Sequence, residues 1–304
     1  MRKFLISALP SLLLLCACRD SKQNDIVPLT IKPDCRRIIS LAPAITEMLF
    51  ALELGDRVVG VSNFCHYPPQ VLELPKIGGL LDPNLEAIAR LQADCVIVYP
   101  NHGSVLEMLK RLKIPVLVAQ GDNLPEIRNT MVLLGKTFHR QEKAQQLVRE
   151  IDQRLDNLRQ HLPPKHLTPS VLVVVWRERG QGTLKNLSVA GQDQYFSEMI
   201  AAAGGRLLPE NQNLDYPNLG TEGILQLNPD LIIEIAPELN DKNSEILTRA
   251  KTDWNLLPAL KAVKNQQIYL ITDDFAAIPG PRCIQLAEKF AEILAPYIHL
   301  ESKP

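Results

Sequence analysis

The feature that most restricts the fold of this chain is an alternation of apolar strand-like runs and amphipathic helical segments that occurs twice. The first series extends from Arg37 to Ala119, and the second begins at Val171 and continues to Ile271. Buried strands that alternate with helices form parallel sheets with helices packed on their faces. The sequence therefore predicts the α/β class, with two Rossmann-like lobes whose sheets are mainly parallel.

A short repeat relates the two series. Residues 86–94 and 222–230 carry Glu, Ile, Leu and Asp at the same relative positions. Each copy begins a predicted helix that leads into an apolar strand. We interpret the repeat as a sign of two related lobes.

A long amphipathic segment lies between the two series. Leucine or isoleucine recurs at positions 147, 151, 155, 158 and 162, so these side chains share one face of a helix. Pro163-Pro164 end that helix. We expect a linking helix over 140–163 that joins an N-terminal lobe (35–139) stiffly to a C-terminal lobe (164–304). An extra surface helix on one large domain is the alternative.

The first residues predict export from the cytoplasm. Two basic residues precede an apolar run that ends at Leu15 and is too short to cross a membrane as a helix, which is typical of a secretion signal. The stretch Leu15-Cys16-Ala17-Cys18 resembles a bacterial lipobox and predicts a signal peptide at 1–17 and a lipid on Cys18. A mainly polar tether follows at 18–34. We expect a protein in the periplasm or at the cell surface, anchored by this lipid; an ordinary cleaved signal is the alternative.

Charge and hydropathy exclude two kinds of partner. Lys and Arg number 33 against 34 Asp and Glu, the net charge is −1, and no basic block occurs, so nucleic acid is not expected as a partner. Beyond residue 17 no apolar run reaches the roughly 20 residues that a membrane-spanning helix needs. The lipid is therefore the only expected attachment to the membrane.

The cysteines of the predicted mature body lie in a compartment that permits disulfides. Spacing alone does not select a pair. Cys95 lies within the apolar run Cys95-Val96-Ile97-Val98 and is expected to be a small buried hydrophobe. The cysteines beyond Cys18 are Cys35, Cys65, Cys95 and Cys283.

Several segments occur in an informative order and spacing. They are Arg37–Glu47, Gly60–Pro69, Gly78-Gly79 with Asp82–Glu86, and Ile278–Arg282. Together they resemble the substrate-binding proteins of ABC importers that have a helical backbone, the family that binds cobalamin and iron chelates. The resemblance implies two lobes joined by the long helix, a ligand in the cleft between them, and delivery to a membrane permease with its ATPase. It favours cobalamin or a related corrinoid as ligand, with a ferric siderophore or haem as the alternative, and a monomeric protein.

The predicted ligand site lies at the carboxyl ends of the strands, where ligands bind in open parallel sheets. Aromatic side chains on the loops there would cover a large planar ligand at low entropic cost; the alternative is that some of them fill loop cores. Arg282 pairs either with Asp273 and Asp274 or with acidic groups of a ligand. The predicted ligand-binding residues are Phe64, Tyr67, Tyr99, Trp176, Tyr216, Asp273, Phe275 and Arg282.

The charge of the ligand bears on two further residues. Arg177 and Arg179 are the other candidates for holding an anionic iron chelate. A corrinoid needs mostly apolar walls and neutral hydrogen bonds. The small number of clear cations on these loops favours a corrinoid.

An enzyme on the same bilobal fold, such as a chelatase, is the main alternative from another class. The sequence lacks a nucleophile paired with a base, a phosphate-binding glycine loop and a zinc helix motif. Cys65, His66 and His102 do not complete a tetrahedral metal site, and Gly180-Gln181-Gly182 is too short to indicate phosphate binding. We therefore predict no catalytic residue, no metal ligand and no cofactor of the protein's own.

Glu86 and Glu222 occupy matching positions of the repeat, one in each lobe. One interpretation is local: Asn84 and Thr221 cap the two helices, and the carboxylates complement the positive helix ends. The resemblance implies a second role, in which the two glutamates dock with arginines of the permease through bidentate pairing. The two roles are compatible.

Overall fold

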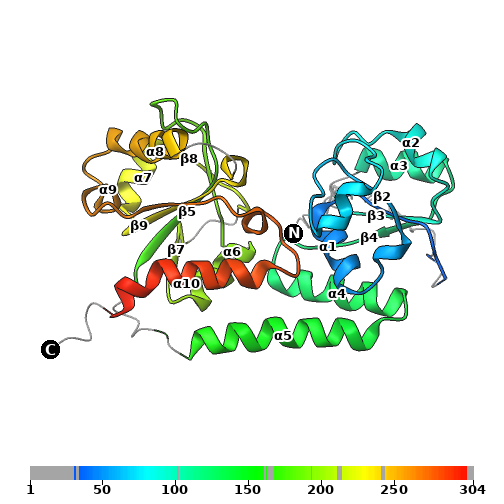
Figure 1. Cartoon of the computed structure of the whole chain (residues 1–304). Coiled ribbons are helices and arrows are strands. Elements are labelled where there is room, and N and C mark those ends of the chain that lie inside the picture. Colours follow the sequence, from blue (N-terminus) through cyan, green and yellow to red (C-terminus); the bar gives the residue numbers. More distant parts are fainter. Residues whose placement is uncertain are drawn as a thin grey trace, which may run out of the picture.

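The computed structural model describes residues 31, 34–100, 103–160, 162, 168–192, 194–210, 214–240 and 244–299. The predicted signal peptide, Cys18, most of the predicted tether and His102 lie outside the described residues. The described chain forms two α/β lobes that lie side by side above long helices, which confirms the predicted fold class (Figure 1). None of its helices combines the length and apolar character needed to cross a bilayer.

Four parallel strands form the sheet of the N-terminal lobe, and every one of them is buried on both faces or nearly so. In sheet order they are β2 (Val58–Val61), β1 (Ile38–Ser40), β3 (Cys95–Val98) and β4 (Val116–Val118). Helices cover both faces of this sheet. On one face lie α1 (Pro43–Ala51) and α4 (Leu124–Thr137), and on the other α2 (Leu85–Arg90) and α3 (Gly103–Arg111).

The sheet of the C-terminal lobe is mixed. In order its strands are β10 (Ile268–Ile271), β9 (Leu231–Ile235), β5 (Ser170–Trp176), β6 (Leu187–Val189) and β8 (Asn218–Leu219), while β7 (Arg206–Leu208) pairs with the start of β5. The strands β10, β9, β5 and β7 are parallel, as predicted. The pairs β5–β6 and β6–β8 are antiparallel, which the sequence did not indicate.

Helices also cover both faces of the second sheet, and three short 3-10 helices accompany it. One face packs against α6 (Tyr195–Ala202) and α10 (Cys283–His299), the other against α7 (Thr221–Leu227), α9 (Lys261–Lys264) and η5 (Asp253–Leu256). At the carboxyl ends of β9 and β10 lie η4 (Pro237–Leu239) and η6 (Asp274–Ala277). A further helix, α8 (Ser244–Thr252), precedes η5.

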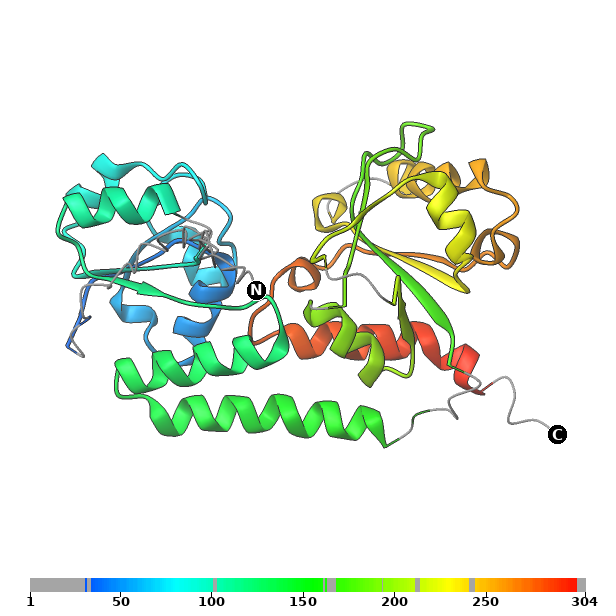
Figure 2. The same ribbon diagram turned by 180° about the vertical axis from the view of Figure 1, so that it is seen from behind.

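The base of the molecule is an antiparallel pair, α4 and α5 (Gln141–Arg159), with α5 running beneath both lobes beside α10 (Figure 2). Arg154 on α5 pairs with Glu288 on α10, with 2.6 Å between Nη2 and Oε2. The helix α5 is the one expected between residues 140 and 163. It ends at Arg159, so Leu162 lies beyond it and is exposed rather than part of the apolar stripe.

One apolar core cluster extends through both lobes and the base. Ile38 of β1, Leu155 of α5, Val173 of β5 and Phe290 of α10 all belong to it and are fully buried. The two sheets are therefore connected by packed side chains as well as by the chain itself.

A disulfide joins Cys35 to Cys95, with Cα atoms 6.6 Å apart. Cys35 comes just before β1, and the register of the adjacent strands pairs Ile38 with Cys95, so the two thiols meet. Cys95 is fully buried, as expected, but it is joined to Cys35 and is not a free thiol. Cys65 and Cys283 are free and buried.

Candidate functional site

Arg282 connects the two lobes. It lies just ahead of α10, and its Nε and Nη2 donate to Oε2 and Oε1 of Glu47 on α1 at 2.9 and 2.6 Å. Its Nη1 and Nη2 also donate to Oδ1 and Oδ2 of Asp274 in η6, both at 2.9 Å. Burial raises the pKa of Glu47, whereas the hydrogen bond from Arg282 lowers the pKa of Asp274. Of the two aspartates expected beside Arg282, Asp274 is the partner.

The same guanidinium lies against two aromatic rings. Its Cζ atom is 3.9 Å from the ring centroid of Tyr67 and 5.9 Å from that of Phe275, which are cation–π distances. Tyr67 follows β2 in the N-terminal lobe and is 42% exposed. The structure therefore brings Tyr67, Phe275 and Arg282 together from both lobes, and their binding of a ligand stays a prediction.

A pocket of about 360 Å³ lies beside this cluster and is lined by both lobes. The C-terminal lobe contributes Pro281 and Arg282. The N-terminal lobe contributes Glu47, Phe50, Ala51, Tyr67, Pro68 and Gln70.

Asp122 marks a second meeting point of the lobes. Its carbonyl oxygen accepts a hydrogen bond of 2.9 Å from the backbone N–H of Tyr195, at the start of α6. Burial and the charge of Asp122 raise the pKa of Tyr216 to about 12 and raise the pKa of Tyr99 above its usual range. Tyr99 belongs to the N-terminal lobe and Tyr216 to the C-terminal lobe. The charge of the Asp122 carboxylate therefore raises the pKa of one predicted site residue in each lobe. The hydroxyl of Tyr216 donates to Oε1 of Gln194 at 2.9 Å.

The remaining predicted ligand residues lie apart from these clusters. Phe64, after β2, is 53% exposed, and Trp176, at the end of β5, is 54% exposed. Neither ring stacks on another ring or on a guanidinium within the part of the chain that the structure describes. Asp273 precedes η6, and its carbonyl oxygen accepts the N–H of Ala276.

Arg177 and Arg179 are directed into the C-terminal lobe, not toward a ligand. Arg177 Nε and Nη2 donate to Oε1 of Glu234 at 2.9 and 2.7 Å, and Arg179 Nε donates to Oε2 of Glu234 at 2.6 Å. Nη1 of Arg177 also pairs with Asp253 at 2.7 Å. Both guanidinium groups are buried and neutralised, so the expectation that they hold an anionic chelate is not supported by their geometry.

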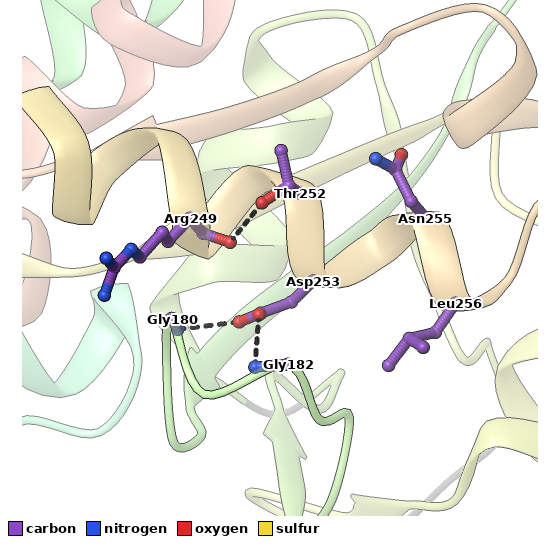
Figure 3. Close-up of a pocket in the computed structure, with 7 residues that line it drawn as sticks. All are labelled: Gly180, Gly182, Arg249, Thr252, Asp253, Asn255 and Leu256. Atoms are coloured by element: carbon purple, nitrogen blue, oxygen red, sulfur yellow. Dashed lines mark hydrogen bonds between the residues drawn. The ribbon is translucent and has the colours of Figure 1, made fainter.

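The glycine loop of residues 180–182 has a structural role. Gly180 and Gly182 have φ angles of +72° and +66°, and their N–H groups donate to the carboxylate of Asp253 at 2.7 and 2.8 Å. Figure 3 shows these bonds at a pocket of about 480 Å³ in the C-terminal lobe, which none of the predicted ligand residues lines. N–H groups bonded to a carboxylate are not available to a phosphate, in agreement with the interpretation of this loop.

Cys65 and His66 lie in different surroundings. Cys65 is buried, and its thiol accepts a hydrogen bond from Thr46 Oγ1 and contacts Ser62 Oγ, both at 3.2 Å, while His66 is exposed. Among the described residues, no three His, Cys, Asp or Glu side chains are grouped closely enough to hold a metal ion.

Glu86 and Glu222 each occupy the second position of a helix, α2 and α7, and both side chains are exposed. Asn84 caps α2 by accepting the N–H of Ala87 at 2.9 Å, as expected. The expectation for the second helix is wrong, because Gly220 occupies the cap position of α7 and Thr221 is its first residue. In the described part of the chain neither glutamate forms a salt bridge.

Comparison with known proteins shows which family the chain resembles. The family model for periplasmic binding proteins matches residues 38–275. The ABC transporter substrate-binding lipoprotein YvrC of Bacillus subtilis is 27% identical over 284 residues, which cover 91% of this chain and 84% of the relative. The vitamin B12-binding protein of Vibrio cholerae is 29% identical over 261 residues, which cover 85% and 88%.

The chain belongs to the periplasmic binding protein family. Its fold matches that of solved members, among them the haem-binding protein HutB of Vibrio cholerae, with a TM-score of 0.73, 24% identity, and coverage of 86% of this chain and 99% of that one. As a periplasmic binding protein it is a substrate-binding component of an ABC importer and not an enzyme.

Two residues of this periplasmic binding protein were missed at the site. Glu47 lies among the buried apolar residues of α1, such as Ile45 and Met48, and an acid on such a face signals a buried partner. Its partner Arg282 is 235 residues away, so no local pattern links them. No pattern in the sequence around Asp122 indicated a role for it, because that role depends on where α6 of the other lobe packs.

Proposed function

We propose that this periplasmic binding protein captures a corrinoid, cobalamin or a close relative, between its lobes and delivers it to a membrane permease and its ATPase. The observation that carries the proposal is the charge of the site. Arg282 at the inter-lobe cluster is paired with the carboxylates of Glu47 and Asp274, and Arg177 and Arg179 are neutralised inside the C-terminal lobe. A ferric siderophore with several negative groups, or haem with its two propionates, would meet the neutralised guanidinium of Arg282 and the carboxylates of Asp122 and Asp274.

A corrinoid suits these surroundings better. Its ring carries amide side chains that need neutral hydrogen-bond partners and apolar walls. The exposed rings of Phe64, Tyr67 and Trp176 supply flat apolar surface, and the Tyr216 hydroxyl and Gln194 supply neutral polar groups. The similarity to the Vibrio cholerae vitamin B12-binding protein supports the same ligand class.

A ligand panel tests the proposal. The soluble chain from residue 19 is titrated by calorimetry with cobalamin, cobinamide, haem and a ferric siderophore. We expect a corrinoid dissociation constant of roughly micromolar or tighter and no saturable binding of the anionic chelates. Saturable binding of haem or of the siderophore, without corrinoid binding, would replace this ligand class with the alternative.

Fluorescence locates the ligand. The chain has two tryptophans, exposed Trp176 and buried Trp254. Bound corrinoid should quench Trp176, so the variant Trp176→Phe should lose most of the quenching while Trp254 keeps reporting on the folded lobe. Equal quenching in the variant would remove Trp176 from the site.

Glu86 and Glu222 are our candidates for docking to the permease. Both are exposed, and α2 and α7 both lie on the side of the molecule opposite α5 (Figure 1). We expect Glu86→Ala/Glu222→Ala to abolish uptake in cells and to leave the corrinoid affinity unchanged. The matched control is Glu73→Ala/Glu178→Ala, which also removes one exposed carboxylate from each lobe. Uptake that survives the first pair, or fails equally with the control pair, would refute the docking role.

Lipidation of Cys18 would hold the protein at the membrane surface. The family relationship to the lipoprotein YvrC supports it. Cys18→Ser should release the protein into the soluble extracytoplasmic fraction and abolish labelling by a radioactive fatty acid. Labelling that persists in the variant would place the lipid elsewhere.

A further inference from the structure

We propose that Glu47 and Arg282 are positioning residues for ligand capture: they hold the ring of Tyr67 from one face so that its other face meets the ligand. The inference rests on the proposed function for the identity of the ligand. It concerns residues that act through Tyr67 and need no ligand contact of their own.

The guanidinium of Arg282 is almost fully occupied. It has five N–H donors in a fixed plane, and four hydrogen bonds go to Glu47 and Asp274. A single N–H remains, so Arg282 is poorly suited to bind an acidic ligand group by a bidentate pair. The guanidinium instead lies over the ring of Tyr67, with its Cζ atom 3.9 Å from the ring centroid.

Glu47 makes this arrangement rigid. Its side chain is nearly completely buried on α1, and a buried carboxylate without its partner is strongly unfavourable, so the guanidinium is held in place. The backbone at Gly280 also packs closely against α1. A Cβ atom added at this position would lie only 3.4 Å from Ala44 Cα and 3.5 Å from Glu47 Oε2. The loop before α10 is thus in contact with α1.

Without the guanidinium, Tyr67 would have room to move. The pocket of about 360 Å³ beside it is bordered by Pro68 and Gln70 as well as by the ring itself. A free ring would have to be ordered at each binding event, and ordering one such side chain weakens binding roughly threefold to tenfold. The positioning pair removes that cost before the ligand arrives.

A double-mutant cycle tests the inference. The change Glu47→Gln/Arg282→Met removes both charges, so no unpaired buried carboxylate is left. In the wild-type background we expect cobinamide affinity to fall threefold to tenfold, and in the Tyr67→Ala background we expect no further loss. In the Tyr67→Phe background, which keeps the aromatic ring, the same pair of changes should again lower the cobinamide affinity threefold to tenfold. The matched control is Arg154→Met/Glu288→Gln, which removes the α5–α10 ion pair and should not change affinity.

Two outcomes of the cycle overturn the inference. An undiminished loss in the Tyr67→Ala background would mean that Arg282 contacts the ligand directly. No loss in the wild-type background would mean that the pair does not position the ring.

A measurement without ligand separates this inference from the proposed function. Hydrogen exchange of residues 62–71 should become faster in Glu47→Gln/Arg282→Met and stay unchanged in the control pair. If wild type binds no corrinoid but exchange accelerates as expected, the proposed ligand fails and the positioning role stands. Unchanged exchange refutes positioning whatever the ligand is.

Discussion

Removing the Cys35–Cys95 disulfide should destabilise the N-terminal lobe substantially. The bond closes a loop with a sequence separation of 60 that contains β1, α1, β2 and α2. In the chain-entropy model, a loop of this length restricts the unfolded chain enough to stabilise the fold by about 4 kcal/mol. Typical domains are stable by only about 5–15 kcal/mol, so this is a large share.

Equilibrium unfolding in guanidinium chloride, followed by circular dichroism, measures the effect. We expect Cys35→Ala/Cys95→Ala to lose about 4 kcal/mol relative to the oxidised wild type. Either single replacement should lower the free energy of unfolding by nearly as much as the double replacement, because each removes the same cross-link. A reducing agent should destabilise the wild type and have no further effect on the variants.

Thiol titration supplies the independent check. In denaturant, the chain from residue 19 should expose two thiols, Cys65 and Cys283, before reduction and four after it. Four reactive thiols before reduction, or a wild type insensitive to reductant, would refute the assignment of the bond. The variant Cys283→Ala serves as the control, since its stability should still depend on the reductant.

Three further predictions concern stability alone. Asn84→Ala removes the cap of α2 and should cost about 1 kcal/mol in denaturant unfolding. Glu234→Gln weakens a fully buried partner of Arg177 and Arg179 and should cost about 3–5 kcal/mol by the same assay. Burial opposes ionisation of Asp230, but hydrogen bonds from Ser170 and Lys261 outweigh it and lower its pKa. The stability it contributes is therefore complete above its ordinary pKa of 3.8 and is lost as the pH falls further, so Asp230→Asn should flatten the urea-unfolding profile in that acid range.

The strand–helix alternation predicted the two sheets because fully buried parallel strands are continuous apolar runs. Val171 to Val175 and Cys95 to Val98 are such runs, and both are central strands. The antiparallel strands β6 and β8 have only three and two residues, too few to show a period. The helix α4 was not predicted, although Asn123 with Pro125 is a start signal that the structure uses.

The sequence predicted the location of the candidate site better than it predicted which side chains pair with each other there. Loops after strands gather at one edge of a sheet, so Tyr67 and Phe275 could be placed there from the sequence. Pairings such as Arg177 with Glu234 and Arg282 with Glu47 depend on side chains 57 and 235 residues apart. The disulfide depends in the same way on the register of β1 against β3. Long-range partners of this kind leave no local pattern.

The shared apolar core has a consequence for how the cargo leaves. Leu155 of α5 packs in the same cluster as Ile38 of one sheet and Val173 of the other, so wide separation of the lobes would expose that surface to water. We expect the scattering profiles of the empty and loaded protein to be nearly superimposable. If the lobes hardly separate on their own, we expect release of the ligand to depend on contact with the permease rather than on thermal opening of the binding protein.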